Sequence, residues 1–295
     1  ASFLSFICHP NLVRYKITPP QAKKYHPRLG FNQMQIDEIV NTTIHKLSDA
    51  GWRKEKRDEL YKEGAAAMRG FLQKDALAQL QEEAQAGFSK AYFNPQKHNI
   101  YLTSSDDTLP CDHIRNFQVS SSKGCICDDV IAKGSPLKQL YHHPLFKSAL
   151  CDILEEEALY PYADNLSSVN IHYARKGEEL GWHFDNSSFA VTLMITPASQ
   201  GGAFEYVRDV RDADANEMGF ERAQNILSGK HPVEEMQMGA GDLLLFRGRN
   251  SLHRVTPVED DSMRQLAVLA YNNAPDISLS KHAQKTFYGR IGTVR

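Results

Sequence analysis

Three residues in the second half of the chain could hold a metal ion. His183 and Asp185 are separated by one residue, and His253 follows much later in the sequence. Side chains alternate between the two faces of a strand, so residues i and i+2 point the same way. In an extended segment His183 and Asp185 therefore face one interior together, while Phe184 faces away. Two histidines and a carboxylate are the ligand set of a non-haem Fe(II) facial triad, which leaves the opposite face of the metal open.

A basic residue follows this set. Arg264 comes soon after His253 and begins an apolar run that ends at Tyr271. A guanidinium holds a carboxylate through two parallel hydrogen bonds. A His-x-Asp pair, a distant histidine and then an arginine resemble the Fe(II)/2-oxoglutarate-dependent oxygenases. The resemblance implies Fe(II), 2-oxoglutarate and O₂, with Arg264 on the distal carboxylate of 2-oxoglutarate; Arg247 and Arg254 are the alternatives for that role.

The surrounding sequence is similar to one group of those oxygenases, the free-amino-acid radical halogenases and their hydroxylase relatives. Chlorinating members of the group resemble the pattern His-x-Gly, because halide takes the third metal position. This chain has Asp185 there, so the resemblance implies hydroxylation, or a related oxidation such as desaturation, and not halogenation. The similarity spans roughly residues 110–291 and is carried by Gly181–Asn186 (GWHFDN), Phe189–Leu193 (FAVTL), Gly201–Tyr206 (GGAFEY), Gly241–Phe246 (GDLLLF), Ser251–Val255 (SLHRV) and Phe287–Arg290 (FYGR).

The same resemblance implies a small free amino acid as the substrate, with lysine or ornithine as the first guess. Such a zwitterion needs a cation for its carboxylate and a carbonyl or anion for its ammonium. Arg115 is the candidate for the substrate carboxylate, Asn186 for the ammonium or polar tail, and Trp182 for a wall of the pocket. Relatives carry Asp where this chain has Asn186, and this departure leaves the substrate side chain open.

The elements around the candidate ligands are short, apolar and separated by turn residues. Short strands divided by Gly, Asn and Asp turns are typical of an antiparallel sandwich or jelly roll. We therefore predict an α+β, mainly β fold: a double-stranded β-helix, or cupin-like jelly roll, with N-terminal packing helices. The predicted strands are 169–173, 189–196, 203–207, 243–246, 253–258 and 264–271.

The earlier part of the chain has a different pattern. Residues 32–47 and 54–86 carry apolar side chains at three- and four-residue spacing among Lys, Glu and Gln, which predicts helices. We predict that residues 1–109 form a mostly helical segment packing on the barrel, and that residues 110–295 form the jelly-roll core. The charged residues 208–235 are predicted to be an insertion near the mouth of the site, where long loops often act as lids.

Composition narrows the class of protein. The 295 residues carry a formal net charge of −2 and a pI of about 6.7, so no basic excess indicates nucleic acid. No apolar run is long enough to predict a membrane span. Five cysteines form no recognisable framework, which favours reduced thiols in a cytoplasmic protein. A homodimer is one candidate assembly that the sequence does not decide.

Several alternatives stay open at this point. A nucleic-acid or protein hydroxylase of the same superfamily would carry the same triad, although the balanced charge counts against the former. A jelly-roll protein that binds Fe(II) without consuming 2-oxoglutarate is a non-enzymatic alternative. Asn170 and His172, on a predicted strand before the triad, are either groups near the metal site or satisfied polar residues of the core.

Overall fold

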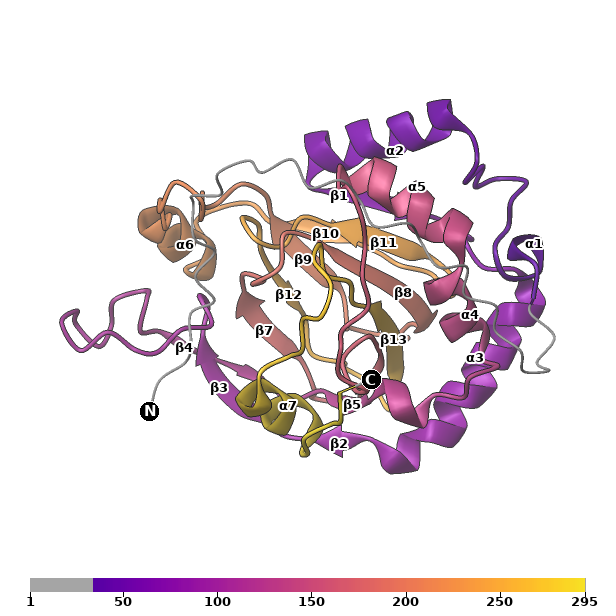
Figure 1. Ribbon diagram of the computed structural model, residues 1–295. Helices are drawn as coiled ribbons and strands as arrows, with labels where there is room; N and C mark the ends of the chain where they lie inside the picture. The colour runs from indigo at the N-terminus through magenta and orange to yellow at the C-terminus, as the bar shows by residue number, and fades with distance from the viewer. Residues whose placement is uncertain (1–33, 295) are drawn as a thin grey trace.

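The computed structural model describes residues 34–294, so the part of the predicted N-terminal segment before Met34 lies outside it (Figure 1). Its helices are α1 (Ile36–Ile39), α2 (Ala50–Glu63), α3 (Lys74–Gly87), α4 (Pro136–His142), α5 (Pro144–Leu154), α6 (Phe220–Leu227) and α7 (Lys281–Tyr288). Its strands are β1 (Ala65–Met68), β2 (Tyr92–Phe93), β3 (Gln96–Asn99), β4 (Gln118–Ser121), β5 (Gly124–Ile126), β6 (Val169–Ala174), β7 (Leu180–His183), β8 (Ala190–Thr196), β9 (Phe204–Val207), β10 (Glu234–Met236), β11 (Leu243–Phe246), β12 (Leu252–Val255) and β13 (Arg264–Leu269).

The strands form two antiparallel sheets that face each other as a double-stranded β-helix. The larger sheet has the order β1-β11-β8-β13-β6-β5-β2, and the smaller has the order β10-β9-β12-β7-β4-β3. The rings of Phe246 on β11 and His253 on β12 lie 4.7 Å apart between their centroids, so the sheets meet across a shared interior. The predicted jelly roll is confirmed, and the six strands that the sequence predicted appear as β6, β8, β9, β11, β12 and β13.

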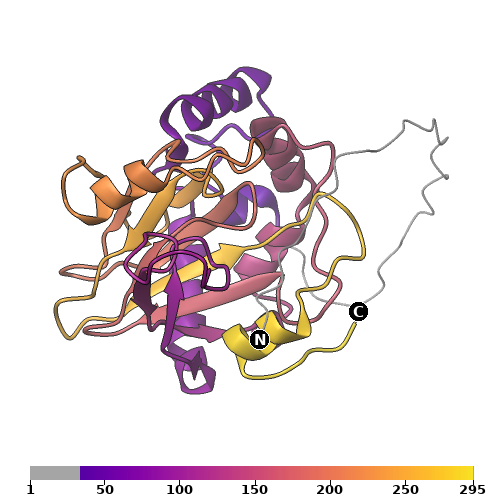
Figure 2. The same ribbon diagram turned by 90° about the vertical axis from the view of Figure 1, so that its left-hand side faces the viewer.

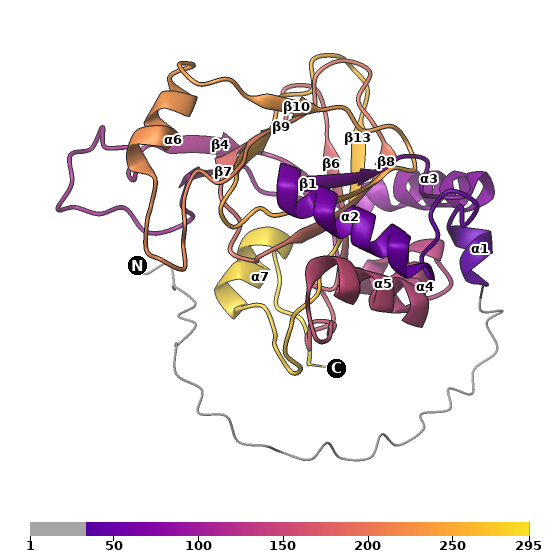
Figure 3. The ribbon, with the colours of Figure 1, turned by 90° about the horizontal axis from the view of Figure 1, so that it is seen from above.

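Alternation along the larger sheet separates a helix-packed face from an interior face. Ile171, Tyr173, Leu193 and Ala267 are buried in the main apolar cluster together with side chains of the N-terminal helices. Figure 3 shows α1 to α5 grouped on that side of the molecule. Residues between these positions, such as His172, point to the opposite face, toward the smaller sheet.

The N-terminal segment contributes strands as well as helices. The helix expected over 54–86 is interrupted, because α2 ends at Glu63 and is followed by Gly64, whose φ of 75° lies in the left-handed region that favours glycine. Residues Ala65–Met68 then pair with β11 as an edge strand. Since β1, β2 and β3 are all built into the two sheets, the predicted division at residue 109 does not mark a structural boundary.

The outer face of the smaller sheet is covered by the predicted insertion. α6 supplies Ala223 and Ile226 to an apolar cluster with Trp182, Phe184 and Leu252. Figure 2 brings this side, with α6 and the strands β3 and β4, toward the viewer. The helix α7 contacts β6, where the Tyr288 hydroxyl donates to Asn170 Oδ1 at 3.0 Å. None of the helices in residues 34–294 has the length and apolar character needed to cross a membrane.

Candidate metal centre

His183 and His253 are direct neighbours across two paired strands. They occupy the same register position of β7 and β12, and their ring centroids are 4.1 Å apart. Nδ1 of His183 lies 2.8 Å from the carbonyl oxygen of Gly181, and Nδ1 of His253 lies 3.0 Å from that of Ser251. A carbonyl only accepts, so each Nδ1 carries the proton and each Nε2 keeps a free lone pair. Both imidazoles are therefore set to bind a metal through Nε2.

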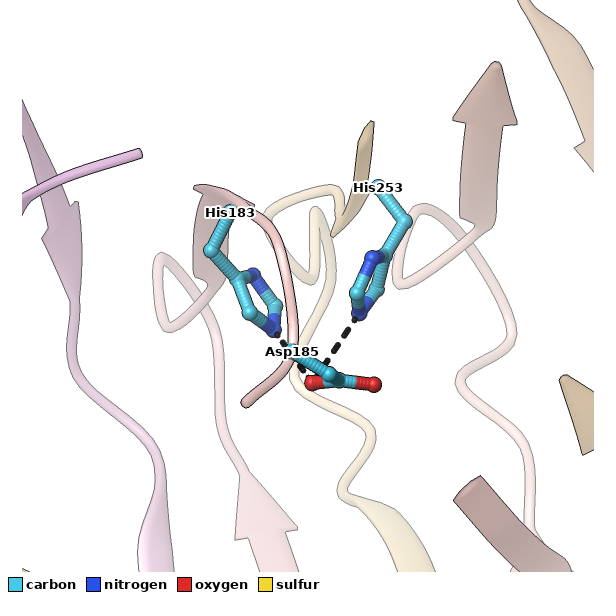
Figure 4. A group of neighbouring side chains, drawn as sticks. All are labelled: His183, Asp185 and His253. Atoms are coloured by element: carbon cyan, nitrogen blue, oxygen red, sulfur yellow. Dashed lines mark ion pairs between the residues drawn. The ribbon is translucent and has the colours of Figure 1, made fainter. Parts of the chain in front are cut away.

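Asp185 completes the set from just beyond the end of β7. Its backbone N–H donates to the carbonyl of Gly248 at 3.0 Å, so the chain stays extended past the last residue of the strand. Oδ1 of Asp185 lies 3.6 Å from Nε2 of His183 and 3.6 Å from Nε2 of His253. The three side chains converge on one point (Figure 4), and their ligand atoms all lie within 4.8 Å of one another. This arrangement is a 2-His-1-carboxylate facial triad that fits one Fe(II).

Burial and charge set the protonation states of these ligands. Burial lowers the pKa of His183 to about 4, with a further contribution from the neighbouring His253. Burial opposes ionisation of Asp185, but the two histidines outweigh it and hold its pKa well below the ordinary value. At neutral pH His183 is thus a neutral donor and Asp185 a carboxylate, which are the forms that bind a divalent metal.

A cationic group faces the triad from the larger sheet. The Arg264 guanidinium, at the start of β13, is buried, and its Nε has no hydrogen-bond partner among the described residues. Burial lowers the pKa of Arg264 to about 10, so it stays charged at neutral pH. A buried charge without a partner is costly. This orphaned nitrogen fits a carboxylate that arrives with a cosubstrate, as the sequence predicts for 2-oxoglutarate.

The two alternative arginines are engaged elsewhere. Arg254 Nε donates to Glu205 at 2.6 Å, and its guanidinium lies over the ring of Trp182 at 4.8 Å. The Arg247 guanidinium lies over the ring of Tyr61 at 4.5 Å. Among the three arginines considered for the cosubstrate, Arg264 is therefore the one that the fold buries inside the barrel.

The residues predicted to contact the substrate are spread over different environments. Asn186 is exposed next to Asp185, and its backbone carbonyl accepts from Arg249 at 3.1 Å. Nε of Arg115 lies 3.6 Å from Oδ2 of Asp106, and it has no hydrogen-bond partner among the described residues. Trp182 lies in the apolar cluster on the outer face of the smaller sheet. Because neighbours in a strand point to opposite faces, Trp182 turns away from the ligand face, and we do not propose it as a substrate contact.

One interior group escaped the sequence analysis altogether. Lys123 precedes β5, and its Nζ lies 2.7 Å from Nδ1 of His172 on β6. Burial lowers the pKa of Lys123 to about 8, and burial together with nearby Lys123 and Arg264 lowers that of His172 well below its ordinary value. The short run Gly124–Ile126 gave no clear strand signal, so the alternation that aligns Lys123 with Cys125 could not be used.

Comparisons with known proteins agree with this geometry. The family model described as Halogenase D matches residues 48–288. A search of curated protein sequences found no match. Similar solved structures include an oxidoreductase of the 2OG-Fe(II) oxygenase family from Burkholderia pseudomallei, with TM-score 0.50, 12% identity and coverage of 78% of this chain and 95% of that chain.

Two further structures are alike at the level of the fold. The non-heme alpha ketoglutarate dependent epimerase SnoN from nogalamycin biosynthesis has TM-score 0.53 and 13% identity, and the match covers 76% of this chain and 84% of that chain. A prolyl hydroxylase from Trichoplax adhaerens, in complex with a hypoxia inducible factor peptide fragment, has TM-score 0.50 and 12% identity, with coverage of 78% and 92%.

Proposed function

The chain belongs to the Halogenase D family and is an Fe(II)/2-oxoglutarate-dependent oxygenase, and from that premise we propose that it hydroxylates an unactivated C–H bond of a small free amino acid. Succinate and CO₂ are the co-products. When bound, iron with 2-oxoglutarate and O₂ supplies the oxidant that removes hydrogen from the substrate. The residues of the chain hold the metal, bind the cosubstrate and decide which C–H bond lies nearest.

The presence of Asp185 is the observation that supports hydroxylation over halogenation. A carboxylate at this position takes the metal site that halide occupies in relatives with the pattern His-x-Gly. Its Oδ1 already lies 3.6 Å from the Nε2 atoms of both His183 and His253. The backbone hydrogen bond to Gly248 fixes the segment that bears it. With that site filled, oxygen and not chlorine is transferred to the substrate.

The substrate class is supported by the resemblance to enzymes of free amino acids and by two polar groups. Asn186 is exposed beside the carboxylate ligand. The buried Nε of Arg115 has no hydrogen-bond partner among the described residues, as expected for a group that receives a carboxylate. We propose Arg115 for the substrate carboxylate and Asn186 for the ammonium or polar tail, with lysine and ornithine as the first amino acids to test.

The experiment is anaerobic loading with Fe(II) and 2-oxoglutarate, followed by exposure to O₂ with each standard amino acid and ornithine in high chloride. High-resolution mass spectra should show one amino acid that gains a single oxygen and no chlorine. A chlorinated main product would refute the proposal, and a product lighter by two hydrogens would indicate desaturation. If peptides but no free amino acid are oxidised, the substrate assignment is wrong while the reaction class stands.

A further inference from the structure

We propose that Lys123, oriented by His172, is a second cationic contact for the distal carboxylate of 2-oxoglutarate. In this arrangement the carboxylate lies between Lys123 and Arg264. Lys123 would then help the site to select a 2-oxo acid that carries a distal carboxylate. The proposal rests on the cosubstrate of the family and is independent of which amino acid is oxidised.

The register of the larger sheet brings the three side chains to one face. His172 on β6 pairs with Leu266 on β13, and Arg264 lies two residues before Leu266. On the other side, Cys125 of β5 pairs with His172. Residues two apart on a strand share a face, so Arg264 and His172 both point into the barrel, and the 2.7 Å contact to His172 draws Lys123 to the same place.

Lys123 also lies where the two sheets join. It follows β4, which belongs to the sheet of the histidine ligands, and precedes β5, which belongs to the sheet of Arg264. Its ammonium interacts electrostatically with both Asp185 and Arg264. A cosubstrate that chelates the metal through one end and reaches Arg264 with the other must cross this region of the interior.

The hydrogen bonding leaves Lys123 with unused donors. His172 is held in the neutral form, so its Nδ1 accepts from the Lys123 ammonium. An ammonium has three donors, and among the described residues Lys123 has hydrogen bonds to His172 alone. Arg264 Nε has no partner at all in that part of the chain. Two neighbouring cations with free donors form a site for the two oxygens of one carboxylate.

The test compares two ligands that differ only in the distal group. Fe(II)-loaded protein is titrated without O₂ by calorimetry with 2-oxoglutarate and with 2-oxopentanoate, which has a methyl group in place of the distal carboxylate. Lys123→Met should weaken 2-oxoglutarate binding by about tenfold or more, the size of a lost charge-assisted hydrogen bond. It should leave 2-oxopentanoate binding unchanged. Lys54→Met, which removes an exposed lysine paired with Asp58 on α2, is the matched control and should change neither affinity.

The other outcomes overturn the proposal. Equal weakening of both ligands would place Lys123 at the metal end of the cosubstrate, and unchanged binding of both would remove it from the site. Lys123→Gln repeats the comparison should the Met variant fail to fold, as judged by its melting curve. His172→Asn keeps an acceptor near the position of Nδ1 and should retain the preference for 2-oxoglutarate, whereas His172→Phe should lose it. Equal preferences in the two histidine variants would contradict the positioning role of His172.

Discussion

At the scale of single residues, the metal centre depends on which ring nitrogen is free. Each histidine uses Nδ1 on a backbone carbonyl two residues earlier, at Gly181 for His183 and Ser251 for His253. Each ring is therefore oriented by its own strand before metal arrives. Asp185 contributes the negative charge of the ligand set. Across the interior, Nε of Arg264 has no hydrogen-bond partner among the described residues.

The ligand role of His183 can be tested by removal. His183→Ala should abolish both stoichiometric Fe(II) binding and succinate formation, because two ligands of the triad cannot replace the third. Metal analysis after gel filtration and a succinate assay measure the two effects. His282→Ala, which changes an exposed histidine on α7, should retain both. Full turnover by the first variant would show that another group binds the iron.

The proposed role of Arg264 can be tested by the kinetics of 2-oxoglutarate. Arg264→Ala should raise the apparent KM for 2-oxoglutarate by about thirtyfold or more, since losing one partner of a buried charge pair costs ~2–5 kcal/mol. Arg254→Ala serves as the comparison, because that guanidinium is already paired with Glu205, and it should leave KM unchanged. The reverse pattern would transfer the role to Arg254.

The proposed choice of hydroxylation over halogenation depends on Asp185. Asp185→Gly should lose hydroxylation, because the metal loses its carboxylate ligand. Efficient chlorination should not appear in its place, since halide also needs donors around it and a substrate held at a suitable distance. Product mass spectra in high chloride measure both changes. Rapid chlorination by this variant would mean that the remaining halide contacts are already present in the chain.

At the scale of elements, the turn after β11 holds the carboxylate ligand in place. A Cβ atom at Gly248 would lie 1.9 Å from Oδ2 of Asp185 and 2.6 Å from its Cγ. The Gly248 carbonyl also accepts the backbone hydrogen bond from Asp185. The position of the Asp185 carboxylate therefore depends on a segment outside its own strand. The turn at Gly248 must lie close enough to hold that carboxylate in place.

Gly248→Ala should therefore displace Asp185 and weaken Fe(II) binding by about tenfold or more, the loss expected when support of a ligand fails. Calorimetric titration with Fe(II) under anaerobic conditions measures the change. In Gly239→Ala the new Cβ would meet its nearest atom at an ordinary 3.5 Å, so metal affinity should be retained. Equal affinities for the two variants would show that Asp185 adjusts without cost.

At the scale of the whole molecule, the barrel places positive charge in its interior in the absence of cosubstrate. Burial lowers the pKa of Lys123 to about 8, while the unfolded chain binds that proton up to the ordinary lysine value. The unfolded state thus holds more protons above pH 8, and stability rises with pH across that interval. Of the groups around Lys123, burial keeps Cys125 protonated by raising its pKa to about 12 and keeps His172 neutral.

Lys123→Met should therefore raise the melting temperature of the protein without cosubstrate at pH 7. The difference from the natural protein should shrink as pH increases from about 8 toward 10.5. Added 2-oxoglutarate should stabilise the natural protein more than the variant, because a ligand stabilises the state that binds it better. Thermal melts at several pH values with and without 2-oxoglutarate provide the measurement. A lower melting temperature of the variant at pH 7 would make Lys123 a structural residue.

The sequence by itself determined the metal ligands and six of the strands, which are β6, β8, β9, β11, β12 and β13. Alternation acts over two residues, so the pairing of His183 with Asp185 could be predicted without the fold. The strands β6, β8 and β13 could be predicted for the same reason, because β-branched and apolar runs between turn residues report local structure.

Only the tertiary structure showed which side chains of the larger sheet face the metal ligands. The approach of Lys123, His172 and Arg264 depends on the register of β5, β6 and β13, and pairing between distant strands leaves no local pattern in the sequence. The short strand β1, between α2 and α3, could not be predicted from the sequence for the same reason. Its pairing with β11 joins residues far apart in the chain. Trp182 turned outward because the same alternation that gathers the ligands places their neighbours on the other face.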